Sequence, residues 1–232
     1  MKWLTFFFSN QESRPPALSP LLFLLIFSVL LVLTYTTLRF YENKSYRDWF
    51  KVLQIFQMSL LYSWYLFMAF SLKESLPFYH CRMAMFACLF LPDRHPWKRY
   101  FVLIGFVGSF LSFVYPIFDH YPLGHVTIFS YLAGHFALYV NCLIYLLRFH
   151  EEAFDRRDVM LKTILLNAFL SVVNLATGGN YGFLRVTPLI GHLSAPIRFL
   201  AVTLVLTFLV CSLDWFFVTK GESVRDLVGQ DF

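Results

Sequence analysis

The run LLFLLIFSVLLVLTYTTL, at residues 21–38, carries no charged side chain over 18 positions. A helix of that length and apolarity spans the roughly 30 Å hydrocarbon core of a bilayer. No small-residue cleavage site follows the run, which distinguishes it from a signal peptide. We therefore expect it to be a transmembrane helix that begins after Pro20.

The composition predicts the same environment for most of the chain. Apolar residues make up 58% of the 232 positions and charged residues only 14%. One soluble domain could not keep that much apolar surface from water. We predict an all-α, polytopic membrane protein, a single integral membrane domain over residues 1–232. It is a bundle of seven transmembrane helices near residues 21–38, 52–72, 77–91, 100–118, 126–147, 160–176 and 197–218.

Lysine and arginine divide unequally between the two sets of loops that such a bundle creates. One set holds 13 of the 19, and the opposite set holds Lys2, Arg14, Lys73, Arg82, Arg185 and Arg198. Because cytoplasmic loops carry the excess of cations, we predict the N-terminus outside and the C-terminus in the cytoplasm. Cations in short loops between apolar segments contact lipid headgroups. We therefore expect membrane lipids as partners and no nucleic acid.

The stretch ESLPFYHCRM, residues 74–83, sets His80, Cys81 and Arg82 side by side at the start of a short apolar segment. A cation or an imidazole near a thiol favours the thiolate, which is the nucleophilic form. Neighbouring helical residues diverge by about 100°, so His80 does not readily point at the Cys81 sulfur. A base from another helix is geometrically easier, and His135 is the candidate. The alternative for Cys81 is an ordinary packing residue.

Two later segments each carry a polar face at helical spacing. The face on 160–176 comprises Asn167, Ser171, Asn174 and Gly178, and the face on 126–147 comprises His135, Tyr139 and Cys142. Such faces commonly form hydrogen bonds between helices, and that alternative stays open for Asn167, Ser171 and Cys142. For His135 the alternative is a satisfied imidazole in the helical core. An ionisable group inside a membrane is a functional candidate by default, so we assign His135 with Cys81 to catalysis.

The stretch NLATGGNYGFLR, residues 174–185, follows the second of these faces. Paired glycines end a helix and let backbone N–H groups approach a ligand closely. Asn180 can donate to an oxyanion, and Arg185 can hold a phosphate or a carboxylate. We assign substrate binding to His80, Arg82, Asn174, Asn180 and Arg185. We expect the catalytic pair and Asn180 to meet in one outward-opening cavity. An ordinary helix C-cap is the alternative for this stretch.

These motifs carry a resemblance to a known family. Leu76-Pro77-x-x-x-Cys81-Arg82, Gly134-His135 and Asn174-x-x-Thr177-Gly178-x-Asn180-Tyr181 resemble the YwaF-like bacterial integral membrane proteins, over roughly residues 50 to 215. That family is similar to the vertebrate transmembrane protein 164 acyltransferases. The YwaF-like family commonly has a histidine two positions before the cysteine, where this chain has Tyr79. The resemblance implies a seven-helix fold in the bacterial cell membrane and cysteine-dependent acyl transfer between lipids, with Cys81 as the nucleophile.

Two other classes of function remain as alternatives. A transporter of ions or small solutes would need polar groups along its path, and Gln54, Gln57 and Asp214 are the candidates toward the cytoplasmic side. A metal site would draw on His80, Asp119, His120, His125 and His192, but no pair has a compact helical spacing. We predict no metal, and no phosphate loop or dinucleotide motif points to a cofactor. The four cysteines lie within apolar segments, which argues against a disulfide framework.

Overall fold

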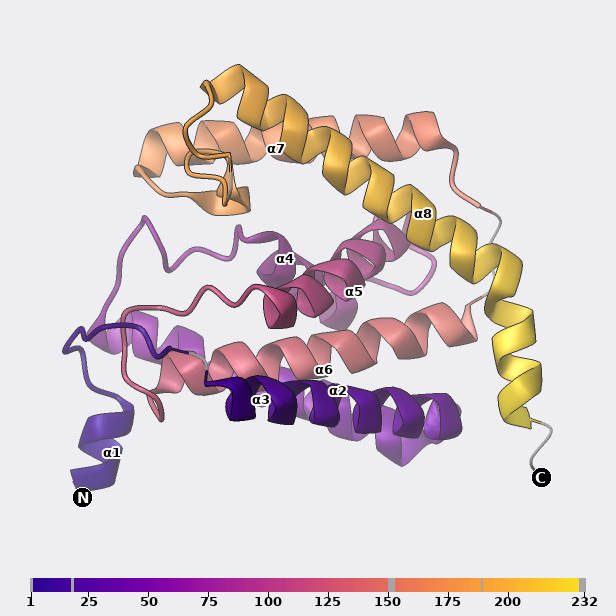
Figure 1. Ribbon diagram of the computed structural model, residues 1–232, viewed down its shortest axis with the longest axis horizontal. Coiled ribbons are helices and arrows are strands. Elements are labelled where there is room, and N and C mark those ends of the chain that lie inside the picture. Colours follow the sequence, from indigo (N-terminus) through magenta and orange to yellow (C-terminus); the bar gives the residue numbers. More distant parts are fainter. Residues whose placement is uncertain (1, 18, 150–152, 189, 230–232) are drawn as a thin grey trace. The chain divides into compact units, whose positions relative to one another are not determined.

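The computed structural model describes residues 2–17, 19–149, 153–188 and 190–229. Every regular element in those ranges is helical, which confirms the all-α class (Figure 1). In chain order the elements are α1 (Lys2–Phe7), α2 (Pro20–Phe40), α3 (Lys44–Met68), α4 (His80–Phe90), α5 (Lys98–Val114), α6 (Val126–Arg148), α7 (Arg156–Thr177), the 3-10 turn η1 (Tyr181–Phe183) and α8 (Ala195–Gly229).

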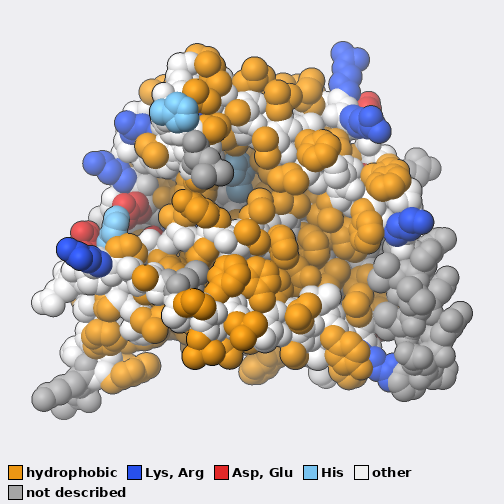
Figure 2. Space-filling model, in the orientation of Figure 1, with side chains coloured by type: hydrophobic (Ala, Val, Ile, Leu, Met, Phe, Trp, Pro, Cys, Tyr) orange, Lys and Arg blue, Asp and Glu red, His pale blue; other side chains and the backbone are white. Residues whose placement is uncertain are grey.

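Four helices among the described residues are long and apolar enough to cross a membrane. They are α2, α6, α7 and the part of α8 from Ala195 to Lys220. Large apolar side chains remain uncovered on them, and Leu175 on α7 is 85% exposed. Hydrophobic side chains also cover most of the face shown in Figure 2. Because an apolar surface of this extent is stable in lipid and not in water, the chain is an integral membrane protein.

Local signals set the ends of the helices. Ser19 caps α2 by accepting from the Leu22 N–H at 3.2 Å, and Asn43 caps α3 by accepting from the Tyr46 N–H at 3.1 Å. The polar turns after Asn43 start α3 at Lys44, earlier than the apolar run at 52 indicates. α5 ends at Val114 and not near 118, since the residue before Pro116 disfavours helical geometry.

The chain folds as two compact units. The first comprises Met1–Phe70 and Gly108–Arg148, and the second comprises Ser71–Val107 and Phe149–Phe232. α5 passes from the second unit into the first. A single domain over the whole chain remains a prediction.

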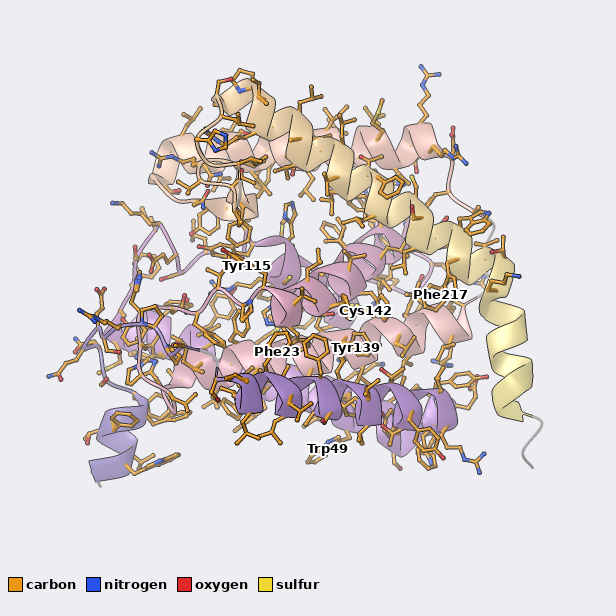
Figure 3. All side chains as sticks on the ribbon, viewed as in Figure 1. Phe23, Trp49, Tyr115, Tyr139, Cys142 and Phe217 are labelled. Atoms are coloured by element: carbon orange, nitrogen blue, oxygen red, sulfur yellow. The ribbon has the colours of Figure 1, made fainter. Side chains whose placement is uncertain are left out.

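In the first unit, α6 packs against α3 and α2. The Asn141 side chain on α6 donates to the Phe50 carbonyl on α3 at 3.2 Å. Tyr139, which is labelled on α6 in Figure 3, shares a 2.9 Å hydrogen bond with Thr34 on α2. A Cβ atom on Gly134 would lie 3.0 Å from Oε1 of Gln57, so glycine permits this close approach of α6 to α3. These contacts make α6 the central helix of the unit.

The N-terminal segment is bound to the same unit. The Ser9 carbonyl accepts from Nε1 of Trp64 at 3.1 Å and from Nε2 of His125 at 2.8 Å. The Ser13 N–H donates to the His120 carbonyl at 2.8 Å. A side chain of α3 and the turn before α6 therefore hold the segment that follows α1.

In the second unit, α7 packs along α8, and two buried cations hold the shorter helices in place. The Lys98 ammonium donates to the Cys88 and Leu91 carbonyls at 2.7 and 2.8 Å, which caps the C-terminus of α4. Arg99 pairs with Asp214 of α8 at 2.6 Å. Both cations belong to the 13 that the sequence places in loops, so two of the predicted loop cations are buried structural groups.

Candidate functional site

His80 stands at the start of α4 and contacts the polar face of α7. Its Nε2 lies 3.3 Å from Oδ1 of Asn167, and the Asn167 amide nitrogen donates to Oγ1 of Thr203 on α8 at 3.0 Å. Asn167 and Thr203 are both buried. An imidazole, an amide and a hydroxyl from three helices thus form one hydrogen-bonded chain.

Cys81 and Arg82 follow in the first turn of α4, and both are half-buried. The Arg82 guanidinium donates to the Glu74 carbonyl at 2.7 Å and lies 4.9 Å from the centre of the Tyr79 ring. Arg82 therefore folds back over the loop that precedes α4. The Cys81 side chain is a thiol, and so are those of Cys88, Cys142 and Cys211.

Asn174 binds the backbone of the residue seven positions later. Its Oδ1 accepts from the Tyr181 N–H at 2.7 Å, and its Nδ2 donates to the Tyr181 carbonyl at 2.8 Å. α7 ends between them, because Gly178 adopts a left-handed conformation (φ +73°) and its N–H donates to the Asn174 carbonyl. The helix end that the paired glycines predict is confirmed, and Asn174 holds the turn that follows it.

Tyr181 connects this turn to the loop before α4. Its hydroxyl donates to the Leu72 carbonyl at 2.8 Å and accepts from the Leu76 N–H at 3.2 Å. The rings of Phe78 and Tyr79 meet the Tyr181 ring at 5.8 and 5.0 Å between centroids. The sequence alone assigns no role to Tyr181, and its place in the motif that runs from Asn174 to Tyr181 is the signal that could have indicated one.

Asn180 organises the loop after η1. Its Oδ1 accepts from the Arg185 and Val186 N–H groups, each at 3.0 Å, and its Nδ2 donates to the Val186 carbonyl at 2.9 Å. Arg185 is exposed, and one of its guanidinium nitrogens lies 3.5 Å from the Gly179 carbonyl. The loop from Asn180 to Val186 is therefore closed on itself by one side chain.

His135 lies on α6 in the first unit and is 9% exposed. Its Nδ1 donates to the Tyr131 carbonyl one turn earlier at 2.7 Å, and the Tyr131 and Phe113 rings lie against the imidazole. Because a carbonyl only accepts, Nδ1 carries the proton and Nε2 carries the lone pair in the neutral ring. This orientation gives His135 the electronic form that a general base requires.

Six of the seven predicted site residues belong to the second unit, and His135 belongs to the first. Within the second unit, His80, Asn174 and Tyr181 join the start of α4 and the loop before it to the α7 face and to η1. The meeting of Cys81, His135 and Asn180 in one cavity stays a prediction.

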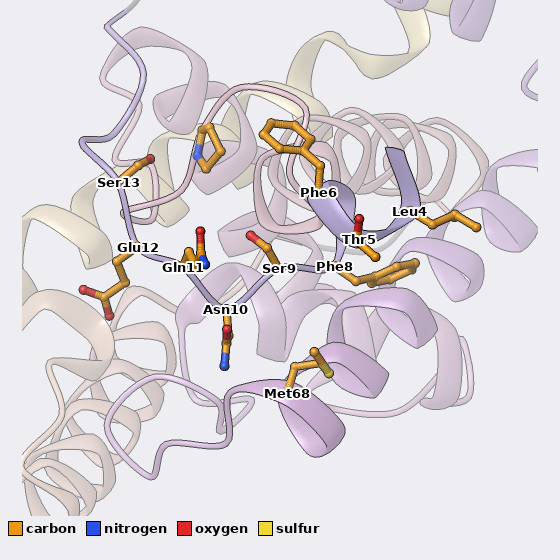
Figure 4. Close-up of a pocket in the computed structure, with 11 residues that line it drawn as sticks. Leu4, Thr5, Phe6, Phe8, Ser9, Asn10, Gln11, Glu12, Ser13 and Met68 are labelled. Carbon is orange, nitrogen blue, oxygen red and sulfur yellow. The ribbon is translucent and has the colours of Figure 1, made fainter. Parts of the chain in front are cut away.

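The structure has a hollow elsewhere, in the first unit. It measures about 780 Å³ and is lined by residues 4–6 and 8–13 with Met68 and Pro122 (Figure 4). None of the predicted site residues lines it. Among the described residues, no three His, Cys, Asp or Glu side chains gather in a way that could hold a metal ion. His125, a candidate ligand, is buried between the Ser9 carbonyl and Thr127.

The fold and these residues define a helical integral membrane protein whose second unit presents an imidazole, a thiol and a guanidinium at one helix start. The profile of the TMEM164 family matches residues 7–216. The chain belongs to the TMEM164 family. Comparison with curated protein sequences and with solved structures gives no significant match.

Proposed function

We propose that this protein is a membrane-embedded acyltransferase or transacylase of lipids, with Cys81 as its nucleophile. The observation that carries the proposal is the first turn of α4. There Cys81 stands in sequence between His80, which bonds the polar face of α7, and Arg82, which folds over the preceding loop. A cation beside a thiol lowers the cost of forming the thiolate. Membership of the TMEM164 family and the resemblance to the transmembrane protein 164 acyltransferases support the same chemistry.

In the proposed reaction the Cys81 thiolate attacks the ester carbonyl of a membrane lipid. His135 accepts the thiol proton at Nε2 and returns it to the leaving alcohol. Donors near Asn180 stabilise the oxyanion, and Arg82 or Arg185 holds the phosphate of the headgroup. Asn180 also has a structural role in this proposal. Its Oδ1 accepts from the Arg185 and Val186 N–H groups and so holds the loop that would present the oxyanion donors.

The proposal includes a topology. All seven segments from α2 to α8 cross or enter the membrane of a bacterial cell, as in the YwaF-like proteins, with the N-terminus outside and the C-terminus in the cytoplasm. α4, with 11 residues, is too short to span a bilayer alone, so it would enter the membrane with the loop that precedes it. This topology puts Cys81 and the loop after η1 on the outer side, where lipids of the outer leaflet have access.

Replacing Cys81 by Ser tests the proposal. Lipid profiles of cells with the wild-type protein, with Cys81→Ser and without the protein should show the same loss of remodelled species in the last two. Cys88→Ser is the matched control, because Cys88 lies two turns along the same helix and has no part in the mechanism. Full activity of Cys81→Ser would exclude a cysteine nucleophile.

One observation favours a transporter as the second candidate. The Gln54 side chain of α3 is fully buried, and neither of its polar atoms has a hydrogen-bond partner among the described residues. A buried amide without a hydrogen-bond partner is a site where a polar solute or water would bind. Asp214, another of the three candidates for a path, is already paired with Arg99. An ion or solute flux that disappears in Gln54→Leu, with lipid composition unchanged, would favour transport.

A further inference from the structure

Lys73 and Arg185 bring two positive charges to the end of α7. Lys73 lies in the loop before α4 and Arg185 in the loop after η1, and both belong to the second unit. A Cβ atom on Gly178 would lie 3.4 Å from Cε of Lys73 and 3.8 Å from Nη1 of Arg185. Two cationic side chains from separate loops therefore border the same small space over the backbone of Gly178.

Neither cation has a carboxylate partner among the described residues. Both side chains are exposed, and the hydrogen bond that the structure gives Lys73 belongs to its backbone N–H. The Arg185 guanidinium has one long contact, 3.5 Å from Nη1 to the Gly179 carbonyl. Glu74 is exposed beside Lys73 and forms no ion pair with either cation. Because neighbouring like charges repel each other, an anion between these two would stabilise their arrangement.

Hydrogen bonds fix the backbone that carries the two cations. The Tyr181 hydroxyl donates to the Leu72 carbonyl at 2.8 Å, one residue before Lys73. Asn180 accepts from the Arg185 N–H at 3.0 Å. Both loops are thus held in place by the protein itself, so a ligand would have to order two side chains and no backbone. Such preorganisation lowers the entropic cost of binding.

The paired glycines keep the space between the cations open. A Cβ atom on Gly179 would lie 2.8 Å from the Lys73 carbonyl oxygen, so glycine permits the close approach of this loop to the end of α7. Gly178 has a φ of +73°, a conformation that asparagine also tolerates. An asparagine side chain at 178 would occupy the space between the two cations, whereas glycine leaves it accessible to a ligand.

Two other cations of the second unit are already engaged with protein loops. The Arg82 guanidinium donates to the Glu74 carbonyl at 2.7 Å and lies 4.9 Å from the centre of the Tyr79 ring. Nε of Arg198 donates to the Leu184 carbonyl at 3.3 Å. Both guanidinium groups hold backbone segments, in contrast to the ammonium of Lys73.

We propose that Lys73 and Arg185 together bind a phosphate group at the end of α7. The oxygens of one phosphate can accept from an ammonium and from a guanidinium at the same time. A phospholipid headgroup and a soluble phosphomonoester both supply this group. The inference goes beyond the proposed function, because it assigns Lys73 to the site, excludes Arg82 from it and does not depend on acyl transfer.

The alternative is that the two cations only complement the end of a helix. The last carbonyl groups of α7 carry partial negative charge, which attracts cations without any ligand. In that case phosphate would not bind, and loss of either cation would change the stability of the protein alone. A binding measurement therefore separates the two roles.

Thermal unfolding of the purified full-length protein in detergent, at constant ionic strength, measures binding. A ligand that binds only the folded protein raises the midpoint temperature. We expect dihexanoylphosphatidate to raise it and dihexanoylglycerol, which lacks the phosphate, to leave it unchanged. Glycerol phosphate is the soluble probe. A rise with glycerol phosphate would show that the phosphate group suffices, and a rise with phosphatidate alone would identify a lipid headgroup as the ligand.

Two variants test the geometry of the site. Lys73→Gln removes one charge, whereas Gly178→Asn keeps both charges and fills the space between them. Each should weaken the binding of phosphatidate about tenfold. Arg14→Gln is the matched control, because it removes the same charge from an exposed residue of the first unit and should bind as the wild type does.

The contrary outcomes are equally specific. A wild-type midpoint that neither phosphate probe raises would overturn the site and leave the two cations as partners of the helix end. Equal weakening in Arg14→Gln and Lys73→Gln, or unchanged binding in Gly178→Asn, would indicate general attraction to a positive surface and would also overturn it. Acyl transfer enters none of these measurements, so the site and the proposed enzymatic function succeed or fail separately.

Discussion

Asn174 and Asn180, which sequence patterns place at a substrate, both use their side-chain amides to bind the backbone of the loop after α7. Arg99 and Asp214 similarly turn out to be partners of each other, although the sequence suggests a loop cation and a transport residue. At the scale of single residues, buried polar groups in this protein hold segments together. How much each of these groups contributes to the free energy of unfolding depends on how far it is buried, and two predictions test this dependence.

Asp214→Asn is expected to destabilise the second unit strongly. Both side chains of the Arg99–Asp214 pair are less than 10% exposed, and Asp214 also accepts from the Phe154 N–H at 2.8 Å. Removing one partner of a buried pair leaves an uncompensated charge, which costs about 3–5 kcal/mol. The measurement is thermal unfolding in detergent. Asp48→Asn is the control, because the Lys44–Asp48 pair is solvent-exposed and should be dispensable. Equal losses of thermal stability in Asp214→Asn and Asp48→Asn would contradict this prediction.

His125 predicts a pH dependence of the N-terminal segment. Burial lowers the pKa of this imidazole, while the Ser9 carbonyl and Asp119 act in the opposite direction. The neutral ring donates to Ser9 and accepts at Nδ1 from the Thr127 N–H. A lowered pKa means that this stability is present above the unfolded pKa of about 6.5 and is lost as the pH falls through the folded value.

Proteolysis within residues 9–13 should therefore accelerate as the pH is lowered from 7 to 5. His125→Gln, which cannot ionise, should remove that pH dependence. An unchanged pH profile in the variant would mean that another group controls the segment.

At the scale of elements, the end of α7 determines where the loops of the second unit lie. Gly178 reverses the chain so that Asn174 can bind Tyr181, and Tyr181 then bonds the loop before α4. The paired glycines are a local signal, so the sequence predicts this helix end. The contact between Tyr181 and residues 72–76 joins positions more than 100 apart, and no local pattern indicates it.

Gly178→Ala should lower the stability of the second unit by about 1 kcal/mol. The reason is the positive φ of +73°, which costs a residue with a Cβ atom about that much. Gly178→Asn should cost less, since asparagine tolerates the left-handed region. Thermal unfolding of the two variants beside the wild type measures the difference, and alanine as stable as asparagine would contradict the role of the backbone conformation.

At the scale of the whole molecule, the TMEM164 match over residues 7–216 includes parts of both units. The proposed topology predicts which loops face outward. A single cysteine at Pro122, in the turn before α6, should react with an impermeant thiol reagent added outside the cell. One at Arg94, between α4 and α5, should react only after permeabilisation. Labelling of the Arg94 cysteine in intact cells, with the Pro122 cysteine labelled only after permeabilisation, would mean that the orientation is the reverse of the proposed one.

The membrane class, the helical segments and the polar face of α7 could all be predicted from the sequence, because each depends on apolar length or on a period along one helix. Helix ends were predictable at Pro20 and Gly178, where a backbone preference acts locally. Boundaries failed where polar turns extend a helix beyond its apolar run, as at the start of α3.

Only the tertiary structure determined which side chains meet. The bond of His80 to Asn167 and the pairing of Arg99 with Asp214 join residues 87 and more than 100 positions apart. Such pairs form because a buried polar group needs a partner, and the partner is whichever group the packing of helices brings near. The sequence shows that His80, Cys81 and Arg82 are adjacent, but the fold decides that the imidazole is held by α7 while the guanidinium turns to the preceding loop.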